Sequence, residues 1–235
     1  MKSSLPGWRH SESRRAFSLM EMLAALALIG VLSAILAGGV RAVTENGRRI
    51  QCTSQLRQIS EAISLYRAEN NNTYPPANPW NADTGDAGWL AWHTGDPKYG
   101  KDSPLAAYVG GVETLRKLSV CPSNSTKFAG PVPDKIRNTY GYPYTVNYNI
   151  MVDSLSAGKT AKNASLVSRP ASTVLMADSA ANSSAWGLGF SDTGSANFQR
   201  IAKRHGEKSN LLWCDGHVTL QSPSTINNTN LYPQP

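Results

Sequence analysis

The longest uncharged apolar segment of the chain runs from Met22 to Val40 and contains no proline. A helix of nineteen residues spans roughly 28 Å, which is about the hydrocarbon thickness of a bilayer. Glu21 stands directly before this segment. Because a carboxylate at the edge of an apolar helix is costly, it indicates a functional partner. The pattern predicts one membrane-spanning helix that begins with a functional carboxylate.

Beyond this segment, apolar residues recur at spacings of four and three, which is typical of a helix with one buried face. We therefore predict a continuous helix from Phe17 to about Asn70, roughly 80 Å long. Tyr74-Pro75-Pro76 prevents its continuation, since proline lacks the amide hydrogen. The arginines that follow the span are expected to face solvent or neighbouring subunits. The buried face comprises Cys52, Leu56, Ile59, Ile63 and Tyr66, and the arginines off it are Arg48, Arg49, Arg57 and Arg67.

The rest of the chain alternates between short apolar runs and polar, glycine-rich segments, which indicates a small antiparallel sheet. Period-two alternation of tyrosine and β-branched residues predicts a strand over 138–151. Asp215-Gly216 between two apolar runs predicts a hairpin in which both turn residues have positive φ. The polar tail 222–235 is expected to be loosely held. Further expected elements are a helix within 103–118, a short strand at Leu118–Pro122 and a strand at Ser172–Asp178.

The amino-terminal residues Arg14-Arg15-Ala16-Phe17-Ser18-Leu19-Met20-Glu21, followed by the apolar segment, resemble the processing signal of type IV prepilins and type II secretion pseudopilins. The resemblance implies that a dedicated prepilin peptidase cuts between Ala16 and Phe17 and methylates the new amino terminus. Glu21 would then be the fifth residue of the mature chain. Two positions depart from the family: Ala16 replaces the usual glycine, and Gly38-Gly39 stands where many relatives have a proline.

Two other kinds of segment share this hydrophobic pattern. A secretory signal is cleaved after its apolar region, but no clear small-x-small site follows Val40. A plain membrane anchor accounts for the hydrophobicity and leaves Glu21 without a reason.

The charge distribution adds little to this picture. The formal net charge is +7, and the leader 1–16 holds four basic residues and one acidic residue, so removing it leaves +4. No basic cluster with interleaved aromatic residues indicates a nucleic-acid partner.

The family resemblance implies a bacterial inner-membrane protein that crosses the membrane once, with a cytoplasmic amino terminus and a periplasmic or extracellular domain. The expected division is therefore 1–16 leader, 17–43 transmembrane or filament-core helix and 44–235 extracytoplasmic domain.

A second motif lies near the carboxyl end. His205, nine residues and Asp215-Gly216 resemble the His-x9-Asp-Gly motif that ends a large subgroup of bacterial prepilin-like proteins. That subgroup also carries a Cys-Pro near mid-chain, matched here by Cys121-Pro122. The motif supports membership of the subgroup and assigns no activity.

The side chains around this motif allow two interpretations. His205, His217, Asp178 and Asp215 could form a divalent-metal or hydrogen-bonded cluster. We favour the simpler interpretation, in which Asp215 shapes the turn and His205 caps a loop, so no cofactor is required. No hydrolase motif or phosphate-binding loop is present, and an enzyme is not expected.

Three cysteines would lie outside the cytoplasm, where disulfides persist. Cys52 and Cys121 could join helix to sheet, and Cys214 could remain a buried thiol or replace either. Packed, unpaired cysteines remain an alternative.

Together these features predict an α+β, pilin-like architecture: a long amino-terminal helix whose second half packs on a carboxyl-terminal antiparallel sheet. The resemblance implies a structural subunit of a pilus or secretion pseudopilus, with other pilin subunits and an inner-membrane assembly platform as partners. Glu21 would pair with the amine of Phe17 in an adjoining subunit.

The alternative is a monomeric, membrane-anchored binding module that uses the aromatic loop Trp80–Tyr99. Asp83 and Asp86 in that loop lack the full spacing of a calcium loop. A metal-dependent enzyme built on His205 and Asp215 is a third, weaker option.

Overall fold

A computed structural model of the chain describes residues 18–76, 103–119, 121–123, 144–151, 162–179, 189–190, 193–194, 198 and 201–232. The chain divides into two compact units, Met1–Thr44 and Glu45–Pro235. The long helix α1 (Leu19–Glu69) contributes to both. The expected leader 1–16 lies outside the described residues.

Helix α1 confirms the prediction of one long amino-terminal helix. It ends where Asn71 and Asn72 adopt positive φ values of 51° and 57°, a conformation that asparagine tolerates better than most residues. The amide of Asn72 donates to the carbonyl of Arg67 at 2.8 Å, and Arg67 in turn donates to the Asn72 side chain. The first bond satisfies one of the backbone carbonyls that the carboxyl-terminal end of a helix leaves unpaired.

The second unit contains a five-stranded sheet in the order β3-β1-β2-β4-β5. The four strands β1, β2, β4 and β5 pair antiparallel, which confirms the predicted α+β class with an antiparallel sheet. The edge strand β3 pairs parallel with β1 and was not predicted. The strands are β1 (Thr145–Asn147), β2 (Val174–Ala177), β3 (Gly189–Phe190), β4 (Ser209–Trp213) and β5 (Val218–Gln221).

The strand predicted over 138–151 is much shorter in the structure. Within its described part, only β1 is extended, and 148–150 form a turn. The carbonyl of Asn147 accepts from the amide of Ile150 at 3.1 Å, and its side chain accepts from the amide of Asn149 at 3.0 Å. Asparagine thus diverts the backbone from the sheet, although the period-two pattern of apolar residues continues. Residues 138–143 lie outside the described part.

A short helical region precedes the sheet, as predicted. It contains η3 (Ala106–Tyr108) and α2 (Val112–Leu118). The strand predicted at Leu118–Pro122 is wrong, because the amide of Ser119 donates to the carbonyl of Leu115 and continues the helical turn. The other 3-10 helices in the described part of the chain are η4 (Ala164–Leu166), η5 (Pro170–Ser172), η7 (Pro223–Thr225) and η8 (Asn228–Asn230).

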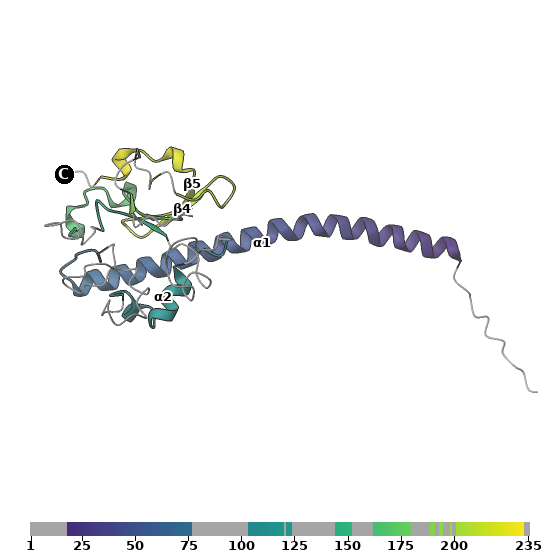
Figure 1. The fold of residues 1–235 in the computed structure, drawn as a ribbon, viewed down its shortest axis with the longest axis horizontal. Coiled ribbons are helices and arrows are strands. Elements are labelled where there is room, and N and C mark those ends of the chain that lie inside the picture. The colour runs from purple at the N-terminus through teal and green to yellow at the C-terminus, as the bar shows by residue number, and fades with distance from the viewer. Residues whose placement is uncertain are drawn as a thin grey trace, which may run out of the picture. The chain divides into compact units, whose positions relative to one another are not determined.

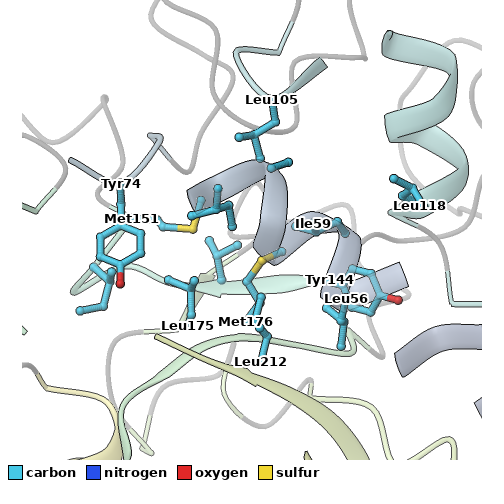
Figure 2. Packing of buried hydrophobic residues seen from close by; sticks show 14 of the residues in the cluster. Leu56, Ile59, Tyr74, Leu105, Leu118, Tyr144, Met151, Leu175, Met176 and Leu212 are labelled. Carbon is cyan, nitrogen blue, oxygen red and sulfur yellow. The ribbon is translucent and has the colours of Figure 1, made fainter. Parts of the chain in front are cut away.

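The core of the second unit forms where the carboxyl-terminal part of α1 lies between the sheet and α2 (Figure 1). Cys52, Leu56, Ile59 and Ile63 are almost completely buried, which confirms the helix face predicted from their spacing. Figure 2 shows Leu56 and Ile59 packed with side chains of the sheet. Met176 and Leu212 supply the sheet side of this cluster.

The opposite face of the sheet is covered as well. Val174 and Leu211 face a second apolar cluster that contains Ile226 and Leu231 from the carboxyl-terminal tail. The side-chain amide of Asn147 donates to the carbonyl of Leu231 at 2.8 Å. The expectation of a loosely held tail is therefore wrong for 222–232, because two apolar side chains and a buried amide fix this polar segment to the sheet.

Candidate functional site

The start of α1 carries the first candidate site. Ser18 precedes the helix, and its hydroxyl accepts from the amide of Met20 at 3.3 Å. The Glu21 carboxylate accepts from the amide of Ser18 at 2.9 Å. This reciprocal arrangement is a capping box, in which side chains satisfy amides at a helix start. Ala16 and Phe17, the predicted cleavage residues, lie outside the described part of the chain.

The first half of α1 exposes large apolar side chains around its whole circumference. Residues 19–36 are exposed throughout and include Leu23, Leu26, Val31 and Leu32, which point in different directions around a helix. Their window, Leu19–Leu36, has a mean hydropathy of 2.3, so within the described residues one helix is long and apolar enough to cross a membrane. A helix that is apolar on all sides requires an apolar environment on all sides.

The two parts of the His-x9-Asp-Gly motif flank strand β4 in the sequence. His205 lies before Ser209–Trp213, and Asp215-Gly216 follows it. A five-residue strand is about 17 Å long, so the two parts of the motif lie at opposite ends of the strand. The four residues of the possible cluster are divided between these ends: His205 lies close to Asp178, whereas Asp215 pairs locally with His217.

The Asp-Gly turn forms a hairpin between β4 and β5, as predicted, but its geometry differs. Gly216 alone has positive φ, at 95°, and its amide donates to the carbonyl of Trp213 at 2.9 Å. The amide of Trp213 donates to the carbonyl of His217 at 3.0 Å. These bonds describe a three-residue loop with glycine at the bulge position, in place of the expected two-residue turn. Asp215 accepts from the amide of His217 and shapes this turn.

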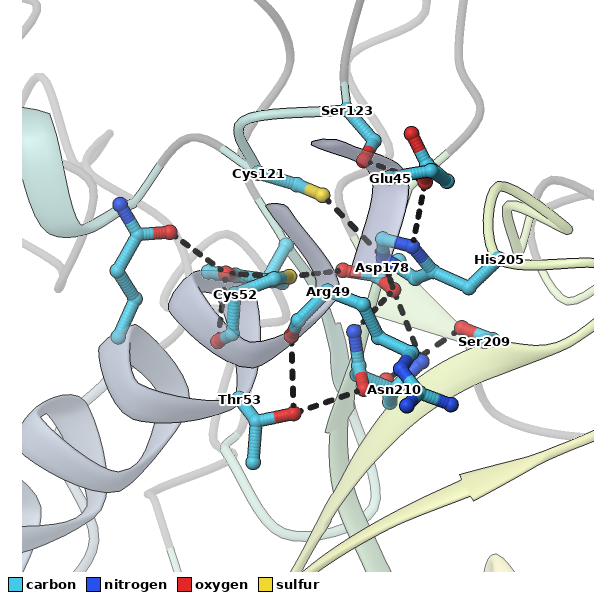
Figure 3. A network of polar contacts seen from close by, with 12 residues as sticks. Glu45, Arg49, Cys52, Thr53, Cys121, Ser123, Asp178, His205, Ser209 and Asn210 are labelled. Atoms are coloured by element: carbon cyan, nitrogen blue, oxygen red, sulfur yellow. Dashed lines mark hydrogen bonds and ion pairs between the residues drawn. The ribbon is translucent and has the colours of Figure 1, made fainter. Parts of the chain in front are cut away.

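His205 is buried in a polar cluster that joins α1 to the sheet (Figure 3). Its Nε2 atom lies 3.5 Å from Cys121 Sγ and 3.6 Å from Asp178 Oδ2. Cys52 Sγ lies 3.2 Å from Asp178 Oδ1. One ligand-type atom from each of these four residues lies within 4.8 Å of the others, and all four residues are buried.

A surrounding layer of polar groups orients the cluster. Glu45 Oε1 lies 3.2 Å from His205 Nδ1 and accepts from the Ser123 hydroxyl at 2.8 Å. The backbone amide of Asn210 donates to Asp178 Oδ2 at 2.9 Å. Figure 3 shows these side chains converging from α1, from the segment after α2 and from the ends of β2 and β4.

The close contacts shift the ionisation of the cluster. Burial raises the pKa of Asp178 to about 6. The hydrogen bond from Cys52, together with that from His205, lowers the pKa of the Cys121 thiol to about 5 despite its burial. The same bond to Cys121, and burial, raise the pKa of Cys52. The cluster therefore favours a Cys121 thiolate beside a protonated Cys52.

The three cysteines are free thiols in this structure. Cys214 stands apart from the cluster, at the start of the Asp-Gly turn, and burial raises its pKa to about 12. Disulfide formation between Cys52 and Cys121 stays a prediction. Sequence reasoning gave Cys52 with Cys121 as a possible disulfide and placed His205 with Asp178 in a separate possible cluster that also held His217 and Asp215. It did not join them, because their proximity depends on the packing of α1 against the sheet.

Two predicted features lie outside the described residues. These are the aromatic loop Trp80–Tyr99, which is the contact surface of the alternative binding-module hypothesis, and its acidic residues Asp83 and Asp86. Among the described residues, one group of His, Cys, Asp and Glu side chains has ligand atoms close enough together to hold a metal ion, and it consists of Cys52, Cys121, Asp178 and His205.

Comparison with known proteins supports the amino-terminal assignment. Residues 13–37 match the family model described as the prokaryotic N-terminal methylation motif. This match supports a type IV pilin-like protein that is processed by a prepilin peptidase. No curated protein and no solved structure matches the chain.

Proposed function

We propose that this chain is a structural subunit of a type IV pilus-like filament or a secretion pseudopilus, released from its leader between Ala16 and Phe17. The observation that carries the proposal is the start of α1: a carboxylate at the first turn of a helix that is apolar on every side, within a matched methylation motif. The same helix serves two environments. It anchors the subunit in the inner membrane before assembly and packs with the helices of other subunits afterwards.

The exposed apolar side chains of α1 require an apolar environment, which is either lipid or other helices. Moving a leucine or isoleucine side chain from water into such an environment is favourable by roughly 1.5–3 kcal/mol. Residues 19–36 present many such side chains to their surroundings. Moving the helix from lipid into a bundle of similar helices gives little further hydrophobic stabilisation. Close packing and polar contacts must therefore favour the assembled state. The carboxylate of Glu21 is the polar group in a position to do so.

The role of Glu21 follows from the chemistry of cleavage. In the uncut chain, its carboxylate accepts from the amide of Ser18. Cleavage before Phe17 creates a positively charged amine one residue away from Ser18. In a dry filament core, neither the amine nor the carboxylate is tolerable alone, and pairing between adjoining subunits neutralises both. The pair therefore fixes the axial register between subunits.

The second unit fits a structural role in this arrangement. Its sheet is buried on both faces, and its polar cluster connects α1 to the sheet. The proposed partners are prepilin peptidase, other pilin or pseudopilin subunits and an inner-membrane assembly platform. The proposed location is a single pass through the bacterial inner membrane, with the second unit in the periplasm or outside the cell.

Replacement of Glu21 tests this proposal. Glu21→Gln removes the charge and keeps the side-chain shape. We expect the variant to be cleaved normally and to be lost from sheared or purified filaments. Glu61→Gln, on an exposed position of the same helix, is the matched control and should assemble normally. Normal incorporation of Glu21→Gln would refute the proposed pairing and favour the anchored binding module.

A further inference from the structure

We propose that Cys52, Cys121, Asp178 and His205 bind one Zn²⁺ ion, which fastens the amino-terminal helix to the sheet. This inference is independent of filament assembly, because it concerns the second unit alone. Its failure would leave the proposed pilin function unchanged.

The distances between the ligand atoms match those of a tetrahedral zinc site. Zinc bonds of about 2.3 Å to sulfur and about 2.0–2.1 Å to nitrogen or oxygen require ligand atoms roughly 3.3–3.8 Å apart. The distance from Cys121 Sγ to His205 Nε2 is 3.5 Å, and that from His205 Nε2 to Asp178 Oδ2 is 3.6 Å. Cys52 Sγ lies 3.2 Å from Oδ1, the other carboxylate oxygen of Asp178. One ligand atom from each of the four residues lies within 4.8 Å of the others. An ion could therefore enter with only small movements of the side chains.

The chemistry of the ligands selects the metal. Zinc in proteins is bound by cysteine sulfur, histidine nitrogen and carboxylate oxygen, and the two thiolates and the imidazole disfavour calcium and magnesium, which take oxygen ligands. Four protein ligands complete the tetrahedral shell, which is typical of a structural site. The His205 and Asp178 side chains are 1% and 0% exposed, respectively. Such burial suits a permanently held ion better than a catalytic one.

The surrounding hydrogen bonds also fit a metal site. Glu45 Oε1 lies 3.2 Å from His205 Nδ1 and can accept a hydrogen there, so a neutral His205 would present the Nε2 lone pair to the ion. The Tyr144 hydroxyl lies 3.1 Å from Cys52 Sγ and can donate to a thiolate. Asn210 holds one oxygen of Asp178 through its backbone amide. Carboxylate-to-histidine contacts of this kind orient ligands in known zinc proteins.

The negative charge of the deprotonated ligands explains why this site would hold a cation. Two thiolates and a carboxylate in a buried site carry three negative charges in their deprotonated forms. Isolated buried charges are costly, and a divalent cation offsets most of this cost. The four ligands come from α1, from the segment after α2, from the end of β2 and from the turn before β4. One ion would therefore connect parts of the chain that are distant in sequence.

The first test is the metal content of the full-length chain, purified in detergent under reducing conditions from cells grown with zinc. Mass spectrometry of the metals should find one Zn²⁺ per chain. Cys121→Ser should lose it, whereas Cys214→Ser, which changes a buried cysteine outside the cluster, should retain it. A wild-type chain that is folded, reduced and unable to take up added Zn²⁺ would overturn the proposal.

Cobalt provides a readout that does not depend on the stability of variants. Added Co²⁺ should give the intense visible bands of a tetrahedral ion and a near-ultraviolet thiolate-to-cobalt band, and Zn²⁺ should abolish both. The spectrum of octahedral cobalt, with no thiolate band, would contradict the proposed ligands.

Glu45 should act as a positioning residue. Glu45→Ala should weaken zinc binding by about 10–100-fold in competition with a chelating dye, as is typical of second-layer partners. Glu61→Ala is the control and should bind as the wild type does. Unchanged affinity in Glu45→Ala would contradict the assigned orientation of His205.

A Cys52–Cys121 disulfide is the competing state, because it consumes both thiolates. Intact mass under non-reducing conditions would detect it as a loss of two hydrogens. If the chain is isolated in this form, it is reduced and then exposed to Zn²⁺. Stoichiometric uptake after reduction supports the zinc site, and failure to bind overturns it.

Discussion

Replacement of Gly216 by alanine should destabilise the second unit for two separable reasons. Gly216 has a φ of 95°, and a left-handed conformation costs an L-residue roughly 1–2 kcal/mol. A Cβ atom at this position would lie 2.9 Å from the Ser60 hydroxyl of α1, closer than packed atoms tolerate. Overpacking typically costs about 1–3 kcal/mol, and here about 1–2 kcal/mol, because the atom that the Cβ meets is a serine hydroxyl that can rotate away. We therefore expect Gly216→Ala to lower the free energy of unfolding by about 2–4 kcal/mol.

A double-mutant cycle separates the two contributions. Ser60→Ala removes the hydroxyl that the new Cβ would meet, so it should recover the packing part of the loss in the Gly216→Ala background. The backbone part, about 1–2 kcal/mol, should remain. Urea unfolding of the detergent-solubilised chain, followed by tryptophan fluorescence, measures each variant. If Gly216→Ala alone falls within about 0.5 kcal/mol of the wild type, neither the turn geometry nor the contact with α1 is as described.

Three further changes test other parts of the fold. Leu56→Ala should lower the free energy of unfolding in urea by about 2–5 kcal/mol, because Leu56 is fully buried. The control Leu65→Ala, at an exposed position of the same helix, should change it by less than about 0.5 kcal/mol. Equal effects would contradict the assigned helix face. Asn147→Ala removes the buried amide that donates to the carbonyls of Val174 and Leu231, and it leaves the Asn149 side chain as a donor to Leu231 at 3.2 Å. Limited proteolysis should therefore release the carboxyl-terminal tail faster than in the wild type, and unchanged release would show that the Asn147 bonds do not hold the tail. Burial raises the pKa of the Cys214 thiol to about 12, so little of the reactive thiolate is present at pH 8. Cys214 should therefore resist alkylation until the chain is unfolded, and rapid reaction in the folded chain would contradict its burial.

Regular spacing made the long helix predictable. The apolar positions from Cys52 to Tyr66 follow a helical period, and the structure buries them as the period requires. The hairpin was also predictable, because Asp-Gly favours a turn wherever two apolar runs flank it. Its loop length was not, since a glycine with positive φ fits both a two-residue turn and a three-residue loop with a bulge.

Local patterns failed where side chains compete for backbone hydrogen bonds. The alternation that continues past Asn147 predicts more strand than exists, because the Asn147 side chain accepts from a backbone amide and starts a turn. The tail was misjudged for a related reason: Ile226 and Leu231 are isolated in a polar segment, yet both are buried against the sheet. Periodicity cannot detect single anchoring residues of this kind.

The polar cluster shows the limit of sequence reasoning about sites. Cys52 occupies a position of the buried helix face and so resembles an ordinary core residue. Its proximity to Asp178, 126 residues away, arises only when α1 packs on the sheet. The His-x9-Asp-Gly spacing is easier to rationalise with the structure in view: it spans β4, with His205 in the cluster at one end and the glycine turn against α1 at the other.

The central claim is that the chain is a processed pilin-like subunit, and the amino terminus of the mature protein tests it most directly. The protein should be isolated from membranes of cells with an active prepilin peptidase and examined by intact mass and amino-terminal sequencing. We expect a chain that begins at Phe17 and carries one added methyl group. A chain that still begins near Met1, without the methyl group, would contradict the claim.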